Sequence, residues 1–283
     1  MPVAGGWESW SWDETLFQGT AAYYLAGRLP YAEGIADAIA SRVPLPTGSR
    51  LLDAGCGPGI VALQLAHLFA GVVGLDPDEG MLAAARVVAL ERGVTNARWV
   101  RMHAEDLPGD LGPFQVATFA ASFHWMDRPR VAKLVREVLA PGGAVVQVHA
   151  PTYRSPGPHR ARPREHPLPP DTAIDRLRRR YLGQDRRAGL GVRNSSPGGE
   201  DAIFQAAGFP LMERIAVPDG RVLTRTTDQL VAYVFSLSST APPLFGARIG
   251  AFEADLRALL ARASSSGFFS VPLPDNELSI WRR

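Results

Sequence analysis

A glycine-rich stretch between a strand-like and a helix-like segment constrains the fold more than any other feature of the sequence. Residues 53–59 read Asp-Ala-Gly-Cys-Gly-Pro-Gly; the apolar run Leu51–Ala54 leads into them and the apolar segment Ile60–Phe69 follows. Glycine lets a backbone approach a ligand where a Cβ would clash. Asp76 ends the next strand-like run, 23 residues after Asp53. In doubly wound α/β folds an acidic residue at this place accepts hydrogen bonds from ribose hydroxyls.

The segments that flank this loop alternate between strand-like and helix-like patterns. A helix is expected from Asp76 to Arg92, ending at Gly93, because proline and acidic residues favour a helix start and glycine a helix end. The apolar residues of 131–139 repeat at helical spacing. Further strands are expected at 72–76, 98–104, 115–121 and 144–148. Such alternation predicts a Rossmann-like, doubly wound, mostly parallel sheet with helices on both faces.

Four regions are expected along the chain. Residues 1–49 hold an aromatic-rich segment and a helix that pack over the core, and residues 50–150 form the core itself. Residues 151–200 are rich in arginine and proline and read as a small cap or lid insert with one helix, 171–182. Residues 201–283 supply the remaining helices and the closing strands, expected at 212–217 and 277–281. The arginine-rich insert is either a lid that attracts an anionic substrate or a solvated surface.

Composition narrows the class of protein. The chain has 283 residues, 46% of them apolar, which is enough for a sizeable core. A formal net charge of +2 argues against broad binding to a nucleic-acid backbone. Cys56 is the single cysteine, and no apolar run reaches the roughly 18 residues of a membrane span. We therefore expect a cytoplasmic protein without a disulfide, nucleic-acid partner or membrane partner, and the sequence does not predict its oligomeric state.

Two classes of nucleoside cofactor suit such a loop, and the residues favour one of them. A dinucleotide site requires Gly-x-Gly-x-x-Gly, so that the pyrophosphate sits on the helix N-terminus. Here the spacing is Gly-x-Gly-x-Gly, with Ile60 next. The carboxylate of Asp53 would repel a pyrophosphate but suits a ligand with an ammonium group. S-adenosyl-L-methionine has an ammonium group and no phosphate, so it is favoured over a nicotinamide dinucleotide.

The same residues resemble a known family. Asp53-x-Gly55-x-Gly57-x-Gly59 with Asp76 is similar to the first two motifs of class I S-adenosylmethionine-dependent methyltransferases. Residues 50–150 resemble the small-molecule branch that includes the ubiquinone/menaquinone and trans-aconitate methyltransferases. The stretches 103–108 and 139–143 and the upstream pattern Tyr24-x-x-x-Arg28-x-Pro30-Tyr31 also resemble that branch, although His103 stands where it often has aspartate.

The resemblance implies a set of cofactor contacts. The glycine loop, with Ala54, Gly55, Cys56 and Gly57, lies against the methionine end of the cofactor. Asp53 holds the ammonium group through water or the backbone, and Asp76 takes both ribose hydroxyls. The other implied contacts are Pro77 and Met81 near the adenine, Ala104 and Glu105 on its other side, and Arg28 at the cofactor carboxylate with Tyr24 beside it.

The residues after the fourth strand are expected to meet the substrate, because ligands of open α/β sheets bind at this edge. Ala121 is expected at the cofactor. His124 either deprotonates the acceptor, as the ordinary near-neutral pKa of a histidine would allow, or orders the loop. Aromatic side chains are attractive neighbours for a sulfonium, and the predicted substrate-binding residues are Phe17, Tyr23, Phe123 and Trp125. Asp127 stands alone, so no metal site is expected.

These observations predict methyl transfer from S-adenosylmethionine to an O, N or C atom of a small-molecule metabolite, acidic metabolites included. Base-modifying nucleic-acid enzymes have an Asn/Asp-Pro-Pro-aromatic motif at this edge, and residues 121–127 carry nothing of that form. The alternative is a protein of the same fold that binds the cofactor for other chemistry or for binding alone, because fold does not fix function.

Overall fold

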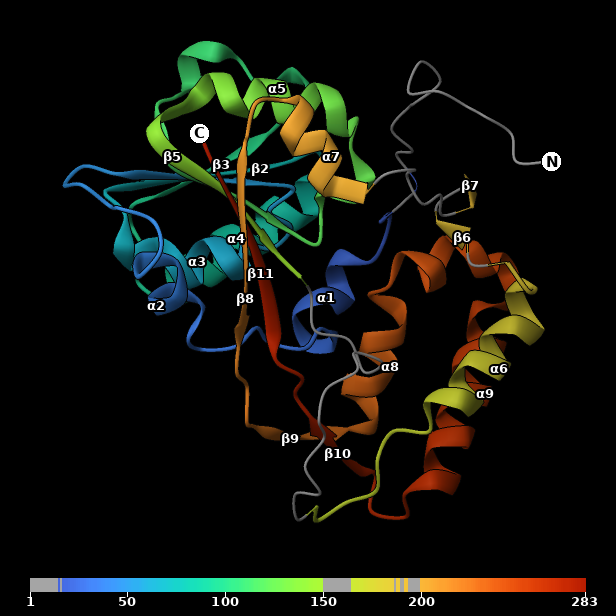
Figure 1. Cartoon of the computed structure of the whole chain (residues 1–283). Helices are drawn as coiled ribbons and strands as arrows, with labels where there is room; N and C mark the ends of the chain where they lie inside the picture. Colours follow the sequence, from blue (N-terminus) through green and yellow to red (C-terminus); the bar gives the residue numbers. More distant parts are fainter. Residues whose placement is uncertain (1–14, 16, 150–163, 186, 189–190, 193–198) are drawn as a thin grey trace.

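A single seven-stranded sheet organises the computed structural model, which describes residues 15, 17–149, 164–185, 187–188, 191–192 and 199–283. The strand order is β3-β2-β1-β4-β5-β11-β8 (Figure 1). The strands are β1 (Arg50–Ala54), β2 (Gly71–Asp76), β3 (Ala97–Arg101), β4 (Phe114–Ala120), β5 (Leu139–Val148), β8 (Leu211–Val217) and β11 (Asn276–Arg282). Strands β1 to β5 pair in parallel, and β11 is antiparallel to both β5 and β8. The predicted mostly parallel sheet is confirmed.

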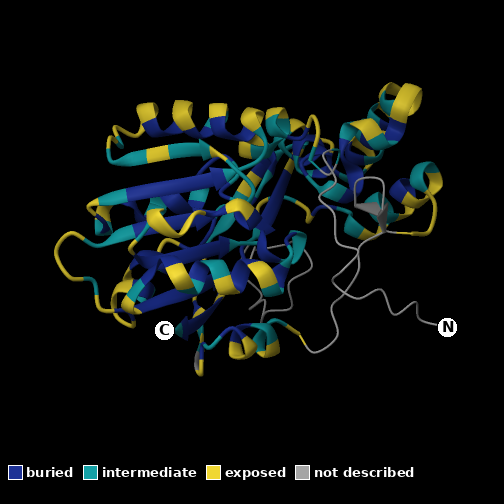
Figure 2. Ribbon diagram, turned by 90° about the horizontal axis from the view of Figure 1, so that it is seen from above, coloured by how far each residue is buried: buried dark blue, intermediate teal, exposed yellow. Residues whose placement is uncertain are grey.

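Helices cover both faces of this sheet, as the sequence predicts. On one face α2 (Ile35–Ala40), α3 (Ile60–Leu65) and α4 (Glu79–Glu91) pack over the apolar side chains of the strands. On the other face lie α5 (Arg128–Val138) and α7 (Gly199–Ala206). Figure 2 shows the buried strands between helices whose outer faces are exposed. The strand order changes direction between β1 and β4, the place where such sheets bind their ligands.

A second group of elements stands beside the sheet, and we call it the helical unit. It consists of α6 (Asp171–Leu182), α8 (Thr227–Phe235), α9 (Ile249–Ala263) and the antiparallel pair β9 (Val222–Thr226) and β10 (Phe268–Pro272). The unit has its own apolar cluster, which includes Leu177, Phe235 and Phe252. The predicted division of the chain assigned α8 and α9 to the core, whereas in the structure they pack with α6 of the predicted insert.

Helix α1 (Ala21–Gly27) lies between the two parts and contacts both α4 and α8 (Figure 1). Two short strands, β6 (Arg187–Ala188) and β7 (Gly191–Val192), pair with each other. Much of the arginine-rich insert, 151–163 and 193–198 included, lies outside the described residues, as do the tryptophans of residues 1–14. No single described helix is long and apolar enough to cross a bilayer; α8 joined to 238–263 passes on length and composition but bends by 100°.

The ring of Trp99 fixes the distance between the glycine loop and the sheet. Trp99 lies on β3, and its ring packs over Gly74 of β2 and over Gly59 at the start of α3. A Cβ on Gly74 would lie 2.5 Å from Cε3 of this ring and 2.9 Å from Sγ of Cys56. Gly59 has φ +74° besides its contact with the ring, so a side chain there would meet both strain and overlap.

We expect Gly74→Ala to lower the free energy of unfolding by about 1–3 kcal/mol, because the added methyl overlaps a packed ring. Gly71→Ala is the matched control on the same strand, since its Cβ would meet its nearest atom, Cγ of Arg50, at 3.9 Å. The control should stay within about 0.5 kcal/mol of the wild type. Urea unfolding of the three proteins measures both changes, and equal effects of the two substitutions would contradict this account of the packing.

Candidate active site

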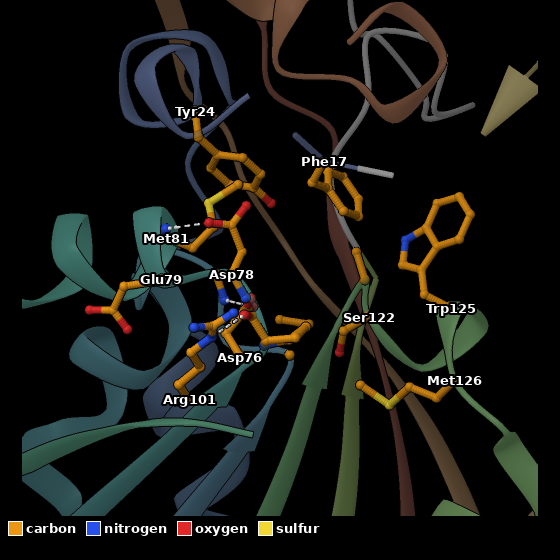
Figure 3. Close-up of a pocket in the computed structure, with 15 residues that line it drawn as sticks. Phe17, Tyr24, Asp76, Asp78, Glu79, Met81, Arg101, Ser122, Trp125 and Met126 are labelled. Atoms are coloured by element: carbon orange, nitrogen blue, oxygen red, sulfur yellow. Dashed lines mark hydrogen bonds between the residues drawn. The ribbon is translucent and has the colours of Figure 1, made fainter. Parts of the chain in front are cut away.

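A cavity opens at the carboxyl ends of β1, β2 and β4. It contains about 960 Å³ of space free of protein atoms, including the part open to solvent. Figure 3 shows its side chains converging from the end of β2, the start of α4, the loop after β4 and helix α1. Nine predicted site residues line it: Phe17, Tyr24, Gly55, Gly57, Asp76, Pro77, Met81, Ala121 and Trp125.

Asp76 is the last residue of β2 and presents its carboxylate to the cavity. Oδ2 accepts a hydrogen bond from the amide of Gly57 at 2.8 Å, and Oδ1 accepts one from the amide of Asp78 at 2.9 Å. Burial raises the pKa of Asp76 to about 6, although these two hydrogen bonds lower it. A carboxylate has about four acceptor sites, so both oxygens can accept further hydrogen bonds from a ligand.

Asp53 is fully buried in β1, one strand over. Its Oδ1 accepts a hydrogen bond from the hydroxyl of Thr118 at 2.7 Å, whereas Oδ2 has no hydrogen-bond partner among the described residues. Burial raises the pKa of Asp53 to about 6; the Thr118 hydroxyl and the Ala62 backbone lower it, and the charge of Asp76 raises it further. A buried carboxylate oxygen without a partner is costly, and a ligand with a cationic donor would relieve that cost.

Arg28 carries a second buried atom of this kind. Its Nε has no partner within the described part of the chain, while Nη2 donates to the carbonyl of Ser236 at 2.8 Å. The guanidinium lies 4.7 Å from the centre of the Tyr24 ring. The charges of Arg28 and Asp53 both act on the pKa of Tyr31, which burial raises. Arg28 and Asp53 therefore each have one buried polar atom without a hydrogen-bond partner among the described residues, although neither residue lines the cavity.

The backbone around the cavity is held in left-handed conformations. Gly57 has φ +53°, and a Cβ built there would meet nothing within 4 Å, so the backbone is open to a ligand. Gly55 has φ +67° and lies against Ser122, whose hydroxyl donates to the carbonyl of Ala54 at 2.6 Å. Ala121 has φ +55° without being glycine. Strained residues of this kind cluster at functional sites.

One wall of the cavity is aromatic. The rings of Phe17 and Trp125 meet edge to face, with centroids 5.8 Å apart and planes at 88° (Figure 3). The other two predicted substrate residues lie elsewhere, which differs from the prediction. Phe123 is 1% exposed and stacks on Phe204 in the core, and Tyr23 packs against Phe235 of the helical unit at 5.1 Å.

Several other predicted residues stand behind the lining. His124 packs on Trp125, with ring centroids 4.5 Å apart, and does not line the cavity; its role as a base stays a prediction. Ala104 and Glu105 are buried in a 3₁₀ turn, where Glu105 accepts a hydrogen bond from the amide of Asp127 at 2.8 Å. Ala54 and Cys56 are also buried, and burial raises the pKa of the Cys56 thiol.

Sequence reasoning missed six lining residues: Asp78, Glu79, Arg101, Ala120, Ser122 and Met126. Two of them carried a usable signal. Asp78 is the N-cap of α4 and accepts from the amides of Gly80 and Met81, at 2.7 and 3.2 Å, so it had to lie beside Asp76. Arg101 ends β3 at the same edge of the sheet. Among the described residues no group of three or more His, Cys, Asp or Glu is arranged to hold a metal ion.

The buried carboxyl of Asp53 makes a testable contribution to stability. Its folded pKa of about 6 lies above the ordinary 3.8, so the folded state keeps a proton that the unfolded chain releases, and stability falls as pH rises through this window. Asparagine does not titrate, so Asp53→Asn does not lose this stability as the pH rises. We expect the unfolding free energy of the variant, relative to the wild type, to rise by about 1.4 kcal/mol between about pH 5 and about pH 7.5. Urea unfolding at both pH values measures it; a pH-independent difference would contradict it.

Comparisons with known proteins show which family the chain resembles. Residues 51–143 match the family described as a methyltransferase domain. The chain is 38% identical over 129 residues to trans-aconitate 2-methyltransferase of Variovorax paradoxus, covering 44% of this chain and 47% of that protein. It is 33% identical over 100 residues to ubiquinone biosynthesis O-methyltransferase of Acinetobacter baumannii, covering 35% of this chain and 42% of that protein. The chain thus spans about half the length of the curated relatives it matches.

A solved structure shares the fold over most of the chain. It is that of an Anaeromyxobacter dehalogenans protein assigned as a type II methyltransferase, with a TM-score of 0.51 and 22% identity, covering 90% of this chain and 96% of that one. At this identity the likeness shows the fold alone. Residues 51–143 of the present chain therefore match a methyltransferase domain, and the chain shares its fold with a protein assigned as a methyltransferase.

Proposed function

We propose that this protein is a methyltransferase that moves a methyl group from S-adenosyl-L-methionine to an O, N or C atom of a small molecule. The observation that carries the proposal is the half-buried carboxylate of Asp76 in the cavity. Outside the lining, the buried carboxylate of Asp53 and the Nε of Arg28 each lack a hydrogen-bond partner among the described residues. The cofactor carries an ammonium, a carboxylate and a ribose diol, which are complementary to these three groups.

The charges of the cavity support this cofactor over a dinucleotide. Three carboxylates line it, those of Asp76, Asp78 and Glu79, against one described cation, Arg101. Glu79 is paired with Arg86 at 2.6 Å, and Asp78 caps a helix, so part of this charge is already offset. A pyrophosphate would still face an excess of like charge, whereas a sulfonium with an ammonium group would not.

Each part of the site has a task in the proposed reaction. The bound cofactor supplies a methyl group on a sulfonium sulfur, which is displaced in line by the acceptor atom. Asp76 orients the ribose through its hydroxyls, and Asp53 and Arg28 hold the two ends of the amino-acid tail. Phe17 and Trp125 shield the acceptor side from water, and alignment of this kind is the main requirement of the reaction.

The aromatic wall supports a flat, largely apolar acceptor. Phe17 and Trp125 offer ring surface, and the hydroxyl of Ser122 is already engaged with the carbonyl of Ala54. Stacking on such rings contributes to binding beyond the area buried. We therefore propose an acceptor with an aromatic or conjugated ring that lies against this wall.

The cofactor assignment predicts a large effect of Asp76→Asn. An amide cannot accept hydrogen bonds from two backbone amides and two ribose hydroxyls at both of its ends, so we expect S-adenosylmethionine to bind about 10- to 100-fold more weakly. Glu91→Gln, at the exposed end of α4, is the control and should bind as the wild type does. Titration calorimetry measures both. Unchanged affinity in Asp76→Asn, or binding of NADH by the wild type, would contradict the proposal.

The acceptor assignment predicts that a change in the aromatic wall weakens binding of the acceptor but not of S-adenosylmethionine. Trp125→Ala should raise KM for the acceptor about tenfold or more, because ring contact is lost, while the Kd for S-adenosylmethionine changes less than about threefold. Trp125→Phe keeps most of the wall and should lie near the wild type. Methyl release is measured against phenols, aromatic amines and polycarboxylic acids. Preference for the polycarboxylic acids would overturn the acceptor assignment, and absence of any methyl release would favour non-methylating chemistry.

A further inference from the structure

The C-terminal turn of α1 is fastened to the helical unit. A Cβ on Gly27 would overlap the backbone of Ala232 in the middle of α8, so the two helices touch backbone to backbone at this point. The contact is possible because residue 27 has no side chain. Helix α1 also carries Tyr24, which lines the cavity (Figure 3). The position of one cavity wall therefore depends on how α1 is seated against α8.

Arg225 of β9 is the group that fastens this turn. Its Nη2 donates to the carbonyl of Ala26 at 2.6 Å and to the carbonyl of Gly27 at 2.7 Å. Arg225 is 7% exposed and has no ion pair among the described residues. Its buried guanidinium is therefore stabilised by hydrogen bonds to two backbone carbonyls. The last carbonyls of a helix lack partners within the helix, and a buried charge requires hydrogen bonds. The guanidinium of Arg225 thus provides donors for the carbonyls at the end of α1, and these carbonyls provide acceptors for the guanidinium.

A second link runs in the opposite direction. Arg28, the C-cap residue of α1, donates from Nη2 to the carbonyl of Ser236, the C-cap residue of α8. Arg225 thus joins the end of α1 to β9, and Arg28 joins it to the end of α8. The same Arg28 has its guanidinium over the Tyr24 ring and an unpartnered Nε. A displacement of this turn would move the ring of Tyr24 and the guanidinium of Arg28 together.

We propose that Arg225 is a positioning residue for the cofactor site: it seats the C-terminal turn of α1 so that Tyr24 and Arg28 reach the cofactor. The helical unit thereby sets cofactor affinity, although Arg225 itself does not line the cavity. The inference rests on the proposed function, because the ligand is taken to be S-adenosylmethionine.

The test compares Arg225→Met with Arg225→Lys and measures the Kd for S-adenosylmethionine by calorimetry on the folded proteins. Methionine keeps the apolar length and removes both donors, so we expect affinity to fall about tenfold. Lysine keeps the charge and can donate to either carbonyl, so it should recover part of the loss. Arg257→Met is the control within the helical unit: Arg257 pairs with Asp228 and Glu253 and has no hydrogen bond or ion pair to the described residues of α1. It should bind as the wild type does.

A double-mutant cycle separates positioning from general stabilisation. If Arg225 acts through the end of α1, Arg225→Met should weaken binding less than about twofold in a background that already carries Arg28→Met. Additive losses would overturn the proposal, as would a lowered Tm with a Kd within about twofold of the wild type. Should Arg225→Met not fold, Arg225→Lys in both backgrounds decides by the same criteria. A wild type that does not bind the cofactor overturns the proposed function as well, whereas a binding wild type with unaffected variants overturns this inference alone.

Discussion

Two carboxylates at the ends of neighbouring parallel strands, one buried and one half-buried, impose the strongest constraint on this structure. Asp76 receives two backbone amides, but Asp53 receives one hydroxyl and keeps an oxygen without a partner among the described residues. Removing two like charges from water costs free energy, and the pKa values near 6 of both groups reflect it. The hydrogen bonds that the described residues donate to these carboxylates offset this cost only in part. A ligand with a cationic nitrogen and hydroxyl donors would offset the rest.

The surrounding packing keeps these carboxylates at a fixed separation. Trp99 covers Gly59 and Gly74, so the glycine loop and β2 cannot move apart independently. Ser122 fills the space beside Gly55 and ties the β4 end to β1. Helix α1 then closes the cavity from the other side, held by hydrogen bonds from Arg225 and to Ser236. The cofactor end of the cavity is therefore built by the sheet, and its opposite wall depends on the helical unit.

The sheet and the cofactor end could be predicted because their signals are local. Glycine spacing, apolar periodicity and an acidic residue at a strand end all lie within short stretches, and the structure has Gly57 and Asp76 in one cavity. The substrate side depended on side-chain direction, which spacing does not give. Tyr23 and Tyr24 are neighbours on α1, yet one packs on Phe235 and the other lines the cavity. Similarly, the 3₁₀ turn of 123–125 directs Phe123 into the core and Trp125 to the cavity. The β9–β10 pair joins segments about 40 residues apart, and nothing local in either strand predicts the other.

The most direct measurement is a crystal structure of the protein with S-adenosylhomocysteine. Our account predicts the ribose hydroxyls on the Asp76 carboxylate, and the amino-acid tail with its ammonium toward Asp53 and its carboxylate toward Arg28. It also predicts the sulfur on the side of the Phe17–Trp125 wall. A ligand seated elsewhere, with Asp53 Oδ2 and Arg28 Nε still unpartnered, would contradict the central claim that these buried groups are complementary to a zwitterionic nucleoside.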